Sequence, residues 1–150
     1  MGSLMGRVVA VLTAAALAGC GGGGPEVEPP KMASATGVVL VDGTPAEGVS
    51  VTFQPVDGGA VSAGTTDEAG EYTLKLQSGS IGEIPGATIG RNRVVISTER
   101  FPEYGDDSPR PIVDGRPETI APQYNKNTTL TADVVEGENF FDFDVDSLRR

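Results

Sequence analysis

The stretch VSVTFQ, residues 49–54, decides the fold class of this chain. Small polar and apolar side chains alternate along it, with Val49, Val51 and Phe53 on one side. Alternation with a period of two is typical of a β-strand that buries one face and exposes the other. The stretch therefore predicts a half-buried strand that ends at Pro55.

Short stretches with similar patterns lie on both sides of this one. The expected strands cover residues 36–41, 63–66, 72–76, 93–98, 129–134 and 141–146. Turn signals separate them, among them residues 42–45 and the turn before Tyr72, in which Gly70 is predicted to have a positive φ. No helix is expected after the first twenty residues. About seven strands with one apolar face each predict an all-β fold, a seven-stranded antiparallel β-sandwich.

A long segment, residues 99–127, separates two of these strands and shows no sustained period. Its prolines, at positions 102, 109, 111, 117 and 122, are expected to prevent regular ladder pairing. Aromatic and arginine side chains are the usual anchors of interfaces, and the segment holds candidates of both kinds. The candidate binding residues are Arg100, Phe101, Tyr104, Arg110 and Arg116. The alternative is a segment that wraps and seals one sheet edge, and the sequence leaves both interpretations open.

The first twenty residues are typical of a targeting segment. Arg7 precedes the apolar run from Val8 to Ala18, which is too short for the roughly 20 residues of a membrane-spanning helix. The run ends in Leu17, Ala18, Gly19 and Cys20, which together resemble the lipobox of bacterial lipoproteins. The resemblance implies cleavage before Cys20, a diacylglyceryl group on its sulfur and an acylated amino terminus. The alternative is an ordinary signal peptide, or a buried helix, with a chance cysteine.

The residues after Cys20 are rich in glycine and proline and predict a tether. Three parts are therefore expected: a lipoprotein signal peptide at 1–19, the lipidated cysteine and flexible linker at 20–33, and one domain at 34–148. Gly21 follows the cysteine where, in enteric bacteria, an aspartate would favour inner-membrane retention. The expected location is thus the outer membrane, with the domain facing the periplasm or the cell surface.

Three segments resemble signatures of the carboxypeptidase regulatory-like domain: residues 37–53, 66–74 and 90–96. In the third signature Asn92 stands where an aromatic residue is common. With residues 120–125 and 137–143 added, the arrangement is similar to small lipoproteins that are numerous in planctomycetes. The resemblance implies a transthyretin-like, or prealbumin-like, sandwich that acts as an accessory or structural module. It brings no catalytic residues to transfer.

Composition excludes several kinds of chemistry. The chain of 150 residues has no histidine and a single cysteine, so Ser–His and Cys–His catalysis and histidine or cysteine zinc sites are excluded. No phosphate-binding loop motif is present. The net charge of −10, without a basic cluster, argues against nucleic-acid binding. We therefore expect no enzymatic activity and no cofactor.

The aspartates of the last expected strand form a candidate cation site. Asp142, Asp144 and Asp146 alternate with apolar residues, so they lie on one face of the strand and resemble the ligands that Ca²⁺ prefers. The alternative is an exposed charged face that discourages pairing at a sheet edge.

These observations favour a membrane-anchored envelope lipoprotein that acts as a non-catalytic structural or protein-interaction module. Its expected partners are the membrane, through the lipid on Cys20, and an envelope protein of unknown identity. The alternative is a ligand-binding module for envelope polysaccharide. Carbohydrate platforms usually expose Trp or Tyr. The chain has no Trp, and Tyr72 is expected in the core, which leaves Tyr104 and Tyr124.

Overall fold

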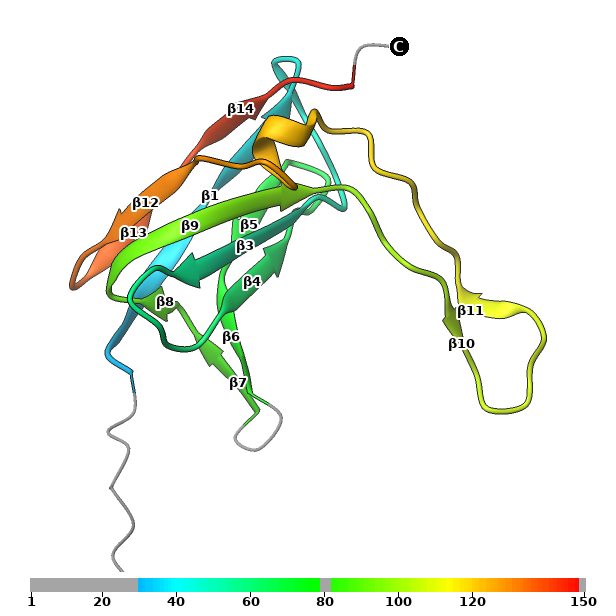
Figure 1. Cartoon of the computed structure of the whole chain (residues 1–150), viewed down its shortest axis with the longest axis horizontal. Helices are drawn as coiled ribbons and strands as arrows, with labels where there is room; N and C mark the ends of the chain where they lie inside the picture. Colours follow the sequence, from blue (N-terminus) through cyan, green and yellow to red (C-terminus); the bar gives the residue numbers. More distant parts are fainter. Residues whose placement is uncertain (1–29, 79–81, 149–150) are drawn as a thin grey trace, which may run out of the picture.

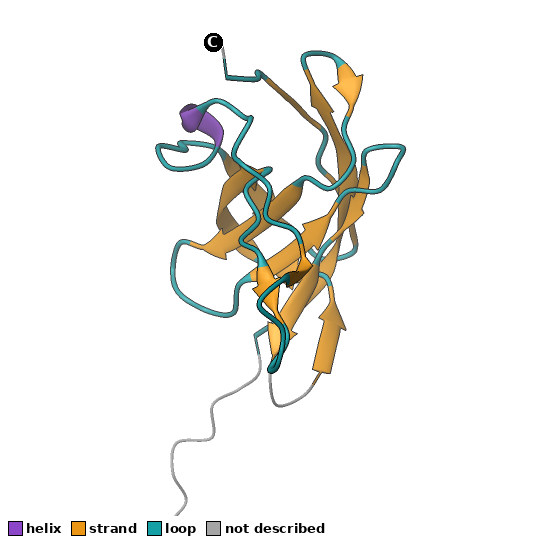
Figure 2. Cartoon of the chain, turned by 90° about the vertical axis from the view of Figure 1, so that its right-hand side faces the viewer, coloured by secondary structure: helices purple, strands orange, loops and turns teal. Residues whose placement is uncertain are grey.

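The computed structural model of the chain describes residues 30–78 and 82–148 (Figure 1). Apart from a single turn of 3₁₀ helix, its regular elements are all strands (Figure 2). They are β1 (Met32–Val41), β2 (Thr44–Pro45), β3 (Ser50–Pro55), β4 (Ser62–Thr65), β5 (Glu71–Thr73), β6 (Lys75–Ser78), β7 (Gly82–Pro85), β8 (Ala87–Thr88), β9 (Gly90–Ser97), β10 (Glu103–Tyr104), β11 (Pro111–Val113), η1 (Pro122–Tyr124), β12 (Thr131–Val134), β13 (Glu138–Phe140) and β14 (Phe143–Val145). The prediction of an all-β sandwich is confirmed.

Two large sheets form the body of the molecule. One has the strand order β12-β9-β3-β4-β6-β7 and is antiparallel throughout. The other is built around the long strand β1, which pairs with β8, β5 and β2 in turn along one side. Along its other side lie β13 and β14. Each sheet therefore presents one face to a shared core.

The pairing of β1 with the last two strands differs from the expected antiparallel arrangement. Ser34 lies opposite Glu138 and Val39 opposite Phe143, and both pairings are parallel. Between these two pairings, β1 and the link from β13 to β14 approach closely at Gly37, where a Cβ would overlap with the carbonyl oxygen of Phe141. Alternation in the sequence predicts that a strand exists but not the direction of its neighbour, so this pairing was not predictable from it.

The chain passes twice from one sheet to the other. The expected strand 72–76 divides at Leu74 into β5, which pairs with β1, and β6, which pairs with β4. The chain returns at Gly86, whose amide donates to the carbonyl of Leu74 at 2.8 Å. Residues 82–88, which the sequence did not predict as strands, form β7 and β8 on either side of this return. The two sheets are thus joined at a corner by continuous backbone.

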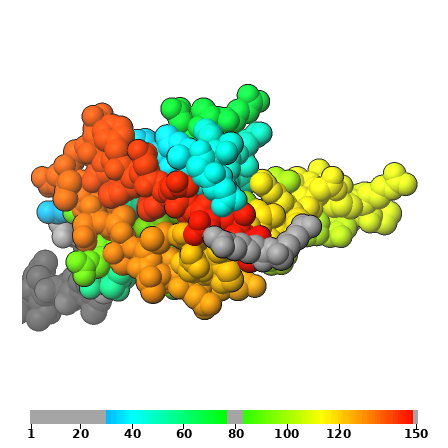
Figure 3. Space-filling model, turned by 90° about the horizontal axis from the view of Figure 1, so that it is seen from above, coloured from blue at the N-terminus to red at the C-terminus, as the bar shows by residue number. Residues whose placement is uncertain are grey.

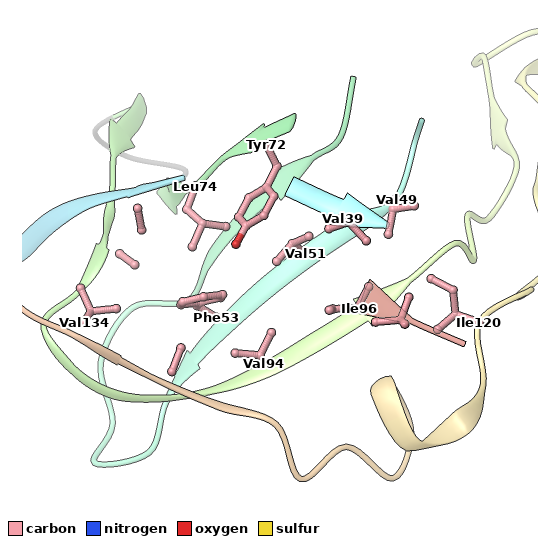
Figure 4. Packing of buried hydrophobic residues seen from close by; sticks show 14 of the residues in the cluster. Val39, Val49, Val51, Phe53, Tyr72, Leu74, Val94, Ile96, Ile120 and Val134 are labelled. Carbon is pink, nitrogen blue, oxygen red and sulfur yellow. The ribbon is translucent and has the colours of Figure 1, made fainter. Parts of the chain in front are cut away.

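The core fills the space between the sheets (Figure 4). The alternating side chains of β3 are fully buried, as predicted, and Phe53 packs against Phe141 with ring centroids 5.4 Å apart. Buried residues come from both sheets and from the segment just before η1: Val39, Val49, Val51, Phe53, Tyr72, Leu74, Val94, Ile96, Ile120, Ala132, Val134 and Val145, with Ala33, Ala35 and Ala87. One contiguous core therefore supports the whole body.

Several predicted boundaries shift. β1 begins at Met32, so the expected limit between linker and domain at 33/34 falls inside a strand. The expected strand 141–146 is replaced by β13 and β14, which are separated at Phe141 and Asp142. The side chain of Asp142 accepts a hydrogen bond from the amide of Val38 at 2.9 Å and so fills the gap in the ladder.

The tight turn before β5 is as predicted. Gly70 has a φ of 75°, which confirms the expected positive value. The Asp67 carboxylate accepts hydrogen bonds from the amides of Ala69 and Glu71, both at 2.9 Å, and fixes the turn. A Cβ on Gly70 would lie 2.7 Å from the carbonyl oxygen of Val39, so the turn requires glycine for space as well as for φ.

Candidate interaction surface

The segment between β9 and η1 leaves the body and returns to it as an arm, residues 99–117. Figures 1 and 3 show that the arm projects away from both sheets. Within it β10 and β11 pair antiparallel, with Glu103 opposite Val113 and Tyr104 opposite Pro111. The register shifts between Glu103 and Tyr104, so the strands pair but the ladder is not regular, which agrees with the prediction that the prolines prevent regular ladder pairing. Pro111 is the first residue of its strand, a position at which a missing N–H is tolerated.

Large apolar side chains of the arm face solvent. Phe101 is 76% exposed, Tyr104 60% and Ile112 68%. Phe101 and Tyr104 were selected from the sequence, and the structure places both on the arm. Ile112 was missed, because one isoleucine among prolines and charged residues belongs to no alternating run. The arm thus presents apolar area that contributes little to the core.

Two of the selected arginines hold the base of the arm. Arg100 and Arg116 exchange backbone hydrogen bonds of 2.9 and 2.7 Å. The Arg100 Nε donates to the carbonyl of Asp114 at 3.1 Å. The Arg116 guanidinium donates to the carbonyls of Glu47 and Gly48, each at 3.2 Å, and so ties the arm to the turn between β2 and β3. These contacts give both arginines an intramolecular role, whereas Arg110 is exposed near the tip.

The hydrogen bonds of Arg116 form a first clamp at the base of the arm. A second clamp, formed by Glu118, lies where the arm rejoins the body. The Glu118 carboxylate accepts hydrogen bonds from the hydroxyl of Ser97, from the amide and hydroxyl of Thr98, and from the amides of Thr119 and Ile120. Partial burial would raise the pKa of Glu118. The hydrogen bonds outweigh that effect and hold this pKa below its ordinary value. Glu118 therefore fixes the returning chain to the end of β9.

The residues after this clamp do cover an edge of the sheet around β1. Ile120 is fully buried and forms an antiparallel bridge with Ser147. The amide of Ala121 donates to Asp146 O at 3.0 Å, and the amide of Leu148 donates to Thr119 O at 2.7 Å. The two interpretations of segment 99–127 thus apply to different parts of it: its second part seals an edge, and the arm does not.

The aspartates of the candidate cation site are not brought together. The carboxylate of Asp142 bonds to β1, as described above, and that of Asp144 accepts from the amide of Gly43 at 3.1 Å. The carboxylate of Asp146 accepts from the hydroxyl of Tyr124 at 3.0 Å. Among residues 30–78 and 82–148, no group of three or more such ligands could hold a metal ion. Each carboxylate instead satisfies a separate donor along the edge, which corrects the candidate site.

The tyrosines differ in the surface that they offer. Tyr72 is buried in the core, as expected, and its hydroxyl donates to the carbonyl of Phe141 at 2.7 Å. Burial, together with the charge of Asp142, raises the pKa of Tyr72 well above its ordinary value. Tyr124 is half-buried and its hydroxyl is bonded to Asp146. Tyr104 is therefore the tyrosine that offers most of its ring to another molecule.

The body also carries an open, polar hollow beside β4 and β5. Its lining residues include Ser50, Thr65, Asp67, Glu71, Lys75 and Glu83. Lys75 Nζ and Glu83 Oε2 form an exposed ion pair at 2.8 Å. An ion pair in this setting contributes little free energy. The hollow lacks the apolar lining of a typical small-molecule site.

The predicted lipidation site lies outside the described residues, as do Leu17, Ala18, Gly19 and the rest of the expected signal peptide. Within the residues that the structure describes, no helix is long and apolar enough to cross a membrane. Comparisons with protein-family models, curated proteins and solved structures find no match to this chain.

Proposed function

We propose that the chain is a membrane-anchored envelope lipoprotein, a non-catalytic module of the carboxypeptidase regulatory-like kind that binds another protein through its arm. The observation that carries the proposal is the arm itself. It projects from a well-packed body with Phe101, Tyr104 and Ile112 exposed. Aromatic side chains held on a stiff support are typical anchors of protein interfaces.

The attachment of the arm supports this role. Clamps at Arg116 and Glu118 hold its returning end to the body, and prolines at positions 102, 109, 111 and 117 restrict its backbone. A restricted segment loses less entropy on binding than a flexible one. Figure 1 shows the chain entering β1 at the lower left of the body, whereas the arm extends on the right. A tether before β1 would therefore leave the arm accessible.

A protein partner is favoured over envelope polysaccharide. Sugar-binding platforms combine an aromatic ring with convergent polar groups in a concave site. The arm projects from the body in Figures 1 and 3, and the polar hollow beside β4 and β5 has Tyr72 buried beneath it. Polysaccharide binding remains the alternative that the capture experiment below separates.

The anchor is tested with Cys20→Ala in cells fed a labelled fatty acid. Wild type is expected to incorporate label and to be processed, because the sulfur of Cys20 is the proposed attachment point. The variant should remain unlabelled and at precursor size. Equal label in both proteins contradicts the lipoprotein proposal.

The arm is tested by affinity capture from envelope extract with the full chain as bait. Residues 101–115 are replaced by a short Gly-Ser linker, and separate baits carry Phe101→Ala or the control Phe140→Ala. The control removes a phenylalanine that is 72% exposed on the body, close to the exposed fraction of Phe101. A captured protein should be lost with the linker and with Phe101→Ala but kept with Phe140→Ala. Capture that survives the linker, or recovery of polysaccharide only, contradicts the proposal.

A further inference from the structure

The strand β11, Pro111–Val113, carries a self-complementary charge pattern together with the residue on each side of it. Residues 110–114 read Arg-Pro-Ile-Val-Asp, so a cation and an anion lie at equal distances on either side of Ile112. All three side chains are exposed. Within the described chain no hydrogen bond or ion pair engages the Arg110 guanidinium or the Asp114 carboxylate, although their backbones take part in turns and in the arm base.

From this pattern we propose that the arm binds the arm of a second copy of the chain, with β11 beside β11 in an antiparallel pair centred on Ile112. In that register Arg110 of each copy lies opposite Asp114 of the other, and the two Ile112 side chains face each other. The arrangement has twofold symmetry and therefore closes as a dimer. It rests on the proposed function of the arm and names the partner.

The hairpin gains structure from such a pairing. A two-stranded hairpin on its own is at best marginally stable in water. A sheet of three or more strands with an apolar face can be stable on its own. The β10–β11 pair of one copy would become half of that larger sheet, and Ile112 would lose contact with water. Pro111 lacks an N–H, whereas Ile112 has one and lies between the two pairs that join β11 to β10, where the register shifts.

The charge of the chain favours contact between the arms of two copies over contact between their bodies. The chain carries a net charge of −10, so two bodies repel each other when they approach. The arm extends clear of the body in Figure 3, which keeps the bodies apart while opposite charges meet on either side of β11. An interface limited to the arms is smaller than the ~800 Å² per partner of a standard interface. The dimer is therefore weak in solution and strengthened where a membrane concentrates the chains.

Charge reversal tests the register. Arg110→Glu places two acids opposite each other in the homodimer, and Asp114→Arg places two cations opposite each other. Each variant alone should weaken self-association of the full chain at least about fivefold in sedimentation equilibrium, given two disrupted cross-strand pairs. An equal mixture of the two variants places the new glutamate opposite the new arginine at one site and keeps Arg110 opposite Asp114 at the other. It should recover association to within about twofold of wild type, as should the double variant.

Disulfide trapping provides a second measurement that does not depend on affinity. Ile112→Cys in the full chain should form a disulfide-linked dimer on mild oxidation, because opposite residues in an antiparallel pair lie within disulfide reach. Val61→Cys, at an exposed position on the body, is the matched control and should remain monomeric.

The outcomes separate this inference from the proposed function. Unchanged association of the single variants, or no recovery in the mixture, overturns the arm-to-arm pairing. If the arm-dependent capture of an envelope protein persists in that case, the proposed function stands with a different partner. If self-association and capture are both independent of the arm, both proposals are wrong.

Discussion

The body and the arm use the same element, an antiparallel strand pair, in opposite surroundings. In the body β3 and β9 pair over the whole of β3, from Ser50 to Pro55, and every second side chain enters the core. In the arm β10 and β11 pair at two positions only, and the large apolar side chains face solvent. Phe53 is fully buried and Phe101 is 76% exposed. The same residue type therefore stabilises the fold in one region and is available to another molecule in the other.

This difference shows what holds each region in place. The body is stabilised by burial of apolar area, which is proportional to the side chains that leave water. The arm has no core of its own, and its conformation depends on the two clamps at its base, Arg116 and Glu118. Loss of a body residue should therefore affect folding, whereas loss of an arm residue should affect binding.

The largest expected effect on the free energy of unfolding comes from replacing Phe53 with alanine. The same replacement at Phe101 is the comparison. Phe53→Ala leaves a cavity beside Phe141 and should lower the free energy of unfolding by about 3–5 kcal/mol. Phe101→Ala should change it by less than about 0.5 kcal/mol, because the side chain is already in water. Urea denaturation of both variants against wild type measures the two values. A loss of stability in Phe101→Ala similar to that of Phe53→Ala would mean that the arm packs on the body.

A smaller effect on stability is expected from substitutions at two glycines. They have the same backbone conformation but differ in the room that surrounds a Cβ. Gly70 and Gly43 have φ values of 75° and 77°. A Cβ on Gly43 would meet nothing within 4 Å, whereas one on Gly70 would lie 2.7 Å from Val39 O. Gly43→Ala should cost about 1 kcal/mol from φ alone. Gly70→Ala should cost about 1–3 kcal/mol more, because the body must shift. Equal melting temperatures in the two variants would show that the turn has room after all.

The body could be predicted from sequence because its strands alternate and its turns carry their own signals. VSVTFQ at 49–54 and the glycine turn at Gly70 contain local information that the tertiary structure does not override. The parallel pairing of β1 with β13 and β14, and the crossing at Leu74, depend on neighbours that are distant in the sequence. The short strands β7 and β8 lie among glycines and prolines that favour turns.

The arm could be predicted only in part. Its aromatic residues and arginines were found because interfaces favour these residue types. The intramolecular roles of Arg100 and Arg116 depend on hydrogen bonds to the carbonyl groups of Asp114, Glu47 and Gly48. No residue pattern in the sequence predicts these bonds. Glu118 was not selected at all, because a single glutamate after a proline has no local signature. Two of its five donors are the amides of Thr119 and Ile120, and the other three, from Ser97 and Thr98, reach it only when the chain returns to the end of β9.

The smallest expected effect concerns this glutamate and the pH dependence of the clamp. The folded-state pKa of Glu118 is lowered, so its contribution to stability is fully present above the ordinary pKa of glutamic acid. As the pH falls from there through the lowered pKa, the unfolded chain takes up the proton first and the contribution is lost. Glu118→Gln should therefore remove part of the acid dependence of unfolding. The expected difference is about 1 kcal/mol at neutral pH, because solvent screens a partly exposed carboxylate.

The matched control for this measurement is Glu99→Gln. Glu99 stands at the other end of the arm, and its carboxylate accepts no hydrogen bond within the described chain. Urea midpoints are recorded for wild type and both variants from neutral to acidic pH. Glu118→Gln should flatten the curve below the ordinary glutamic acid pKa, and Glu99→Gln should follow wild type. Parallel curves for all three proteins would show that the hydrogen bonds to Glu118 do not stabilise its charge, and that the arm is held at its base by Arg116 without the second clamp.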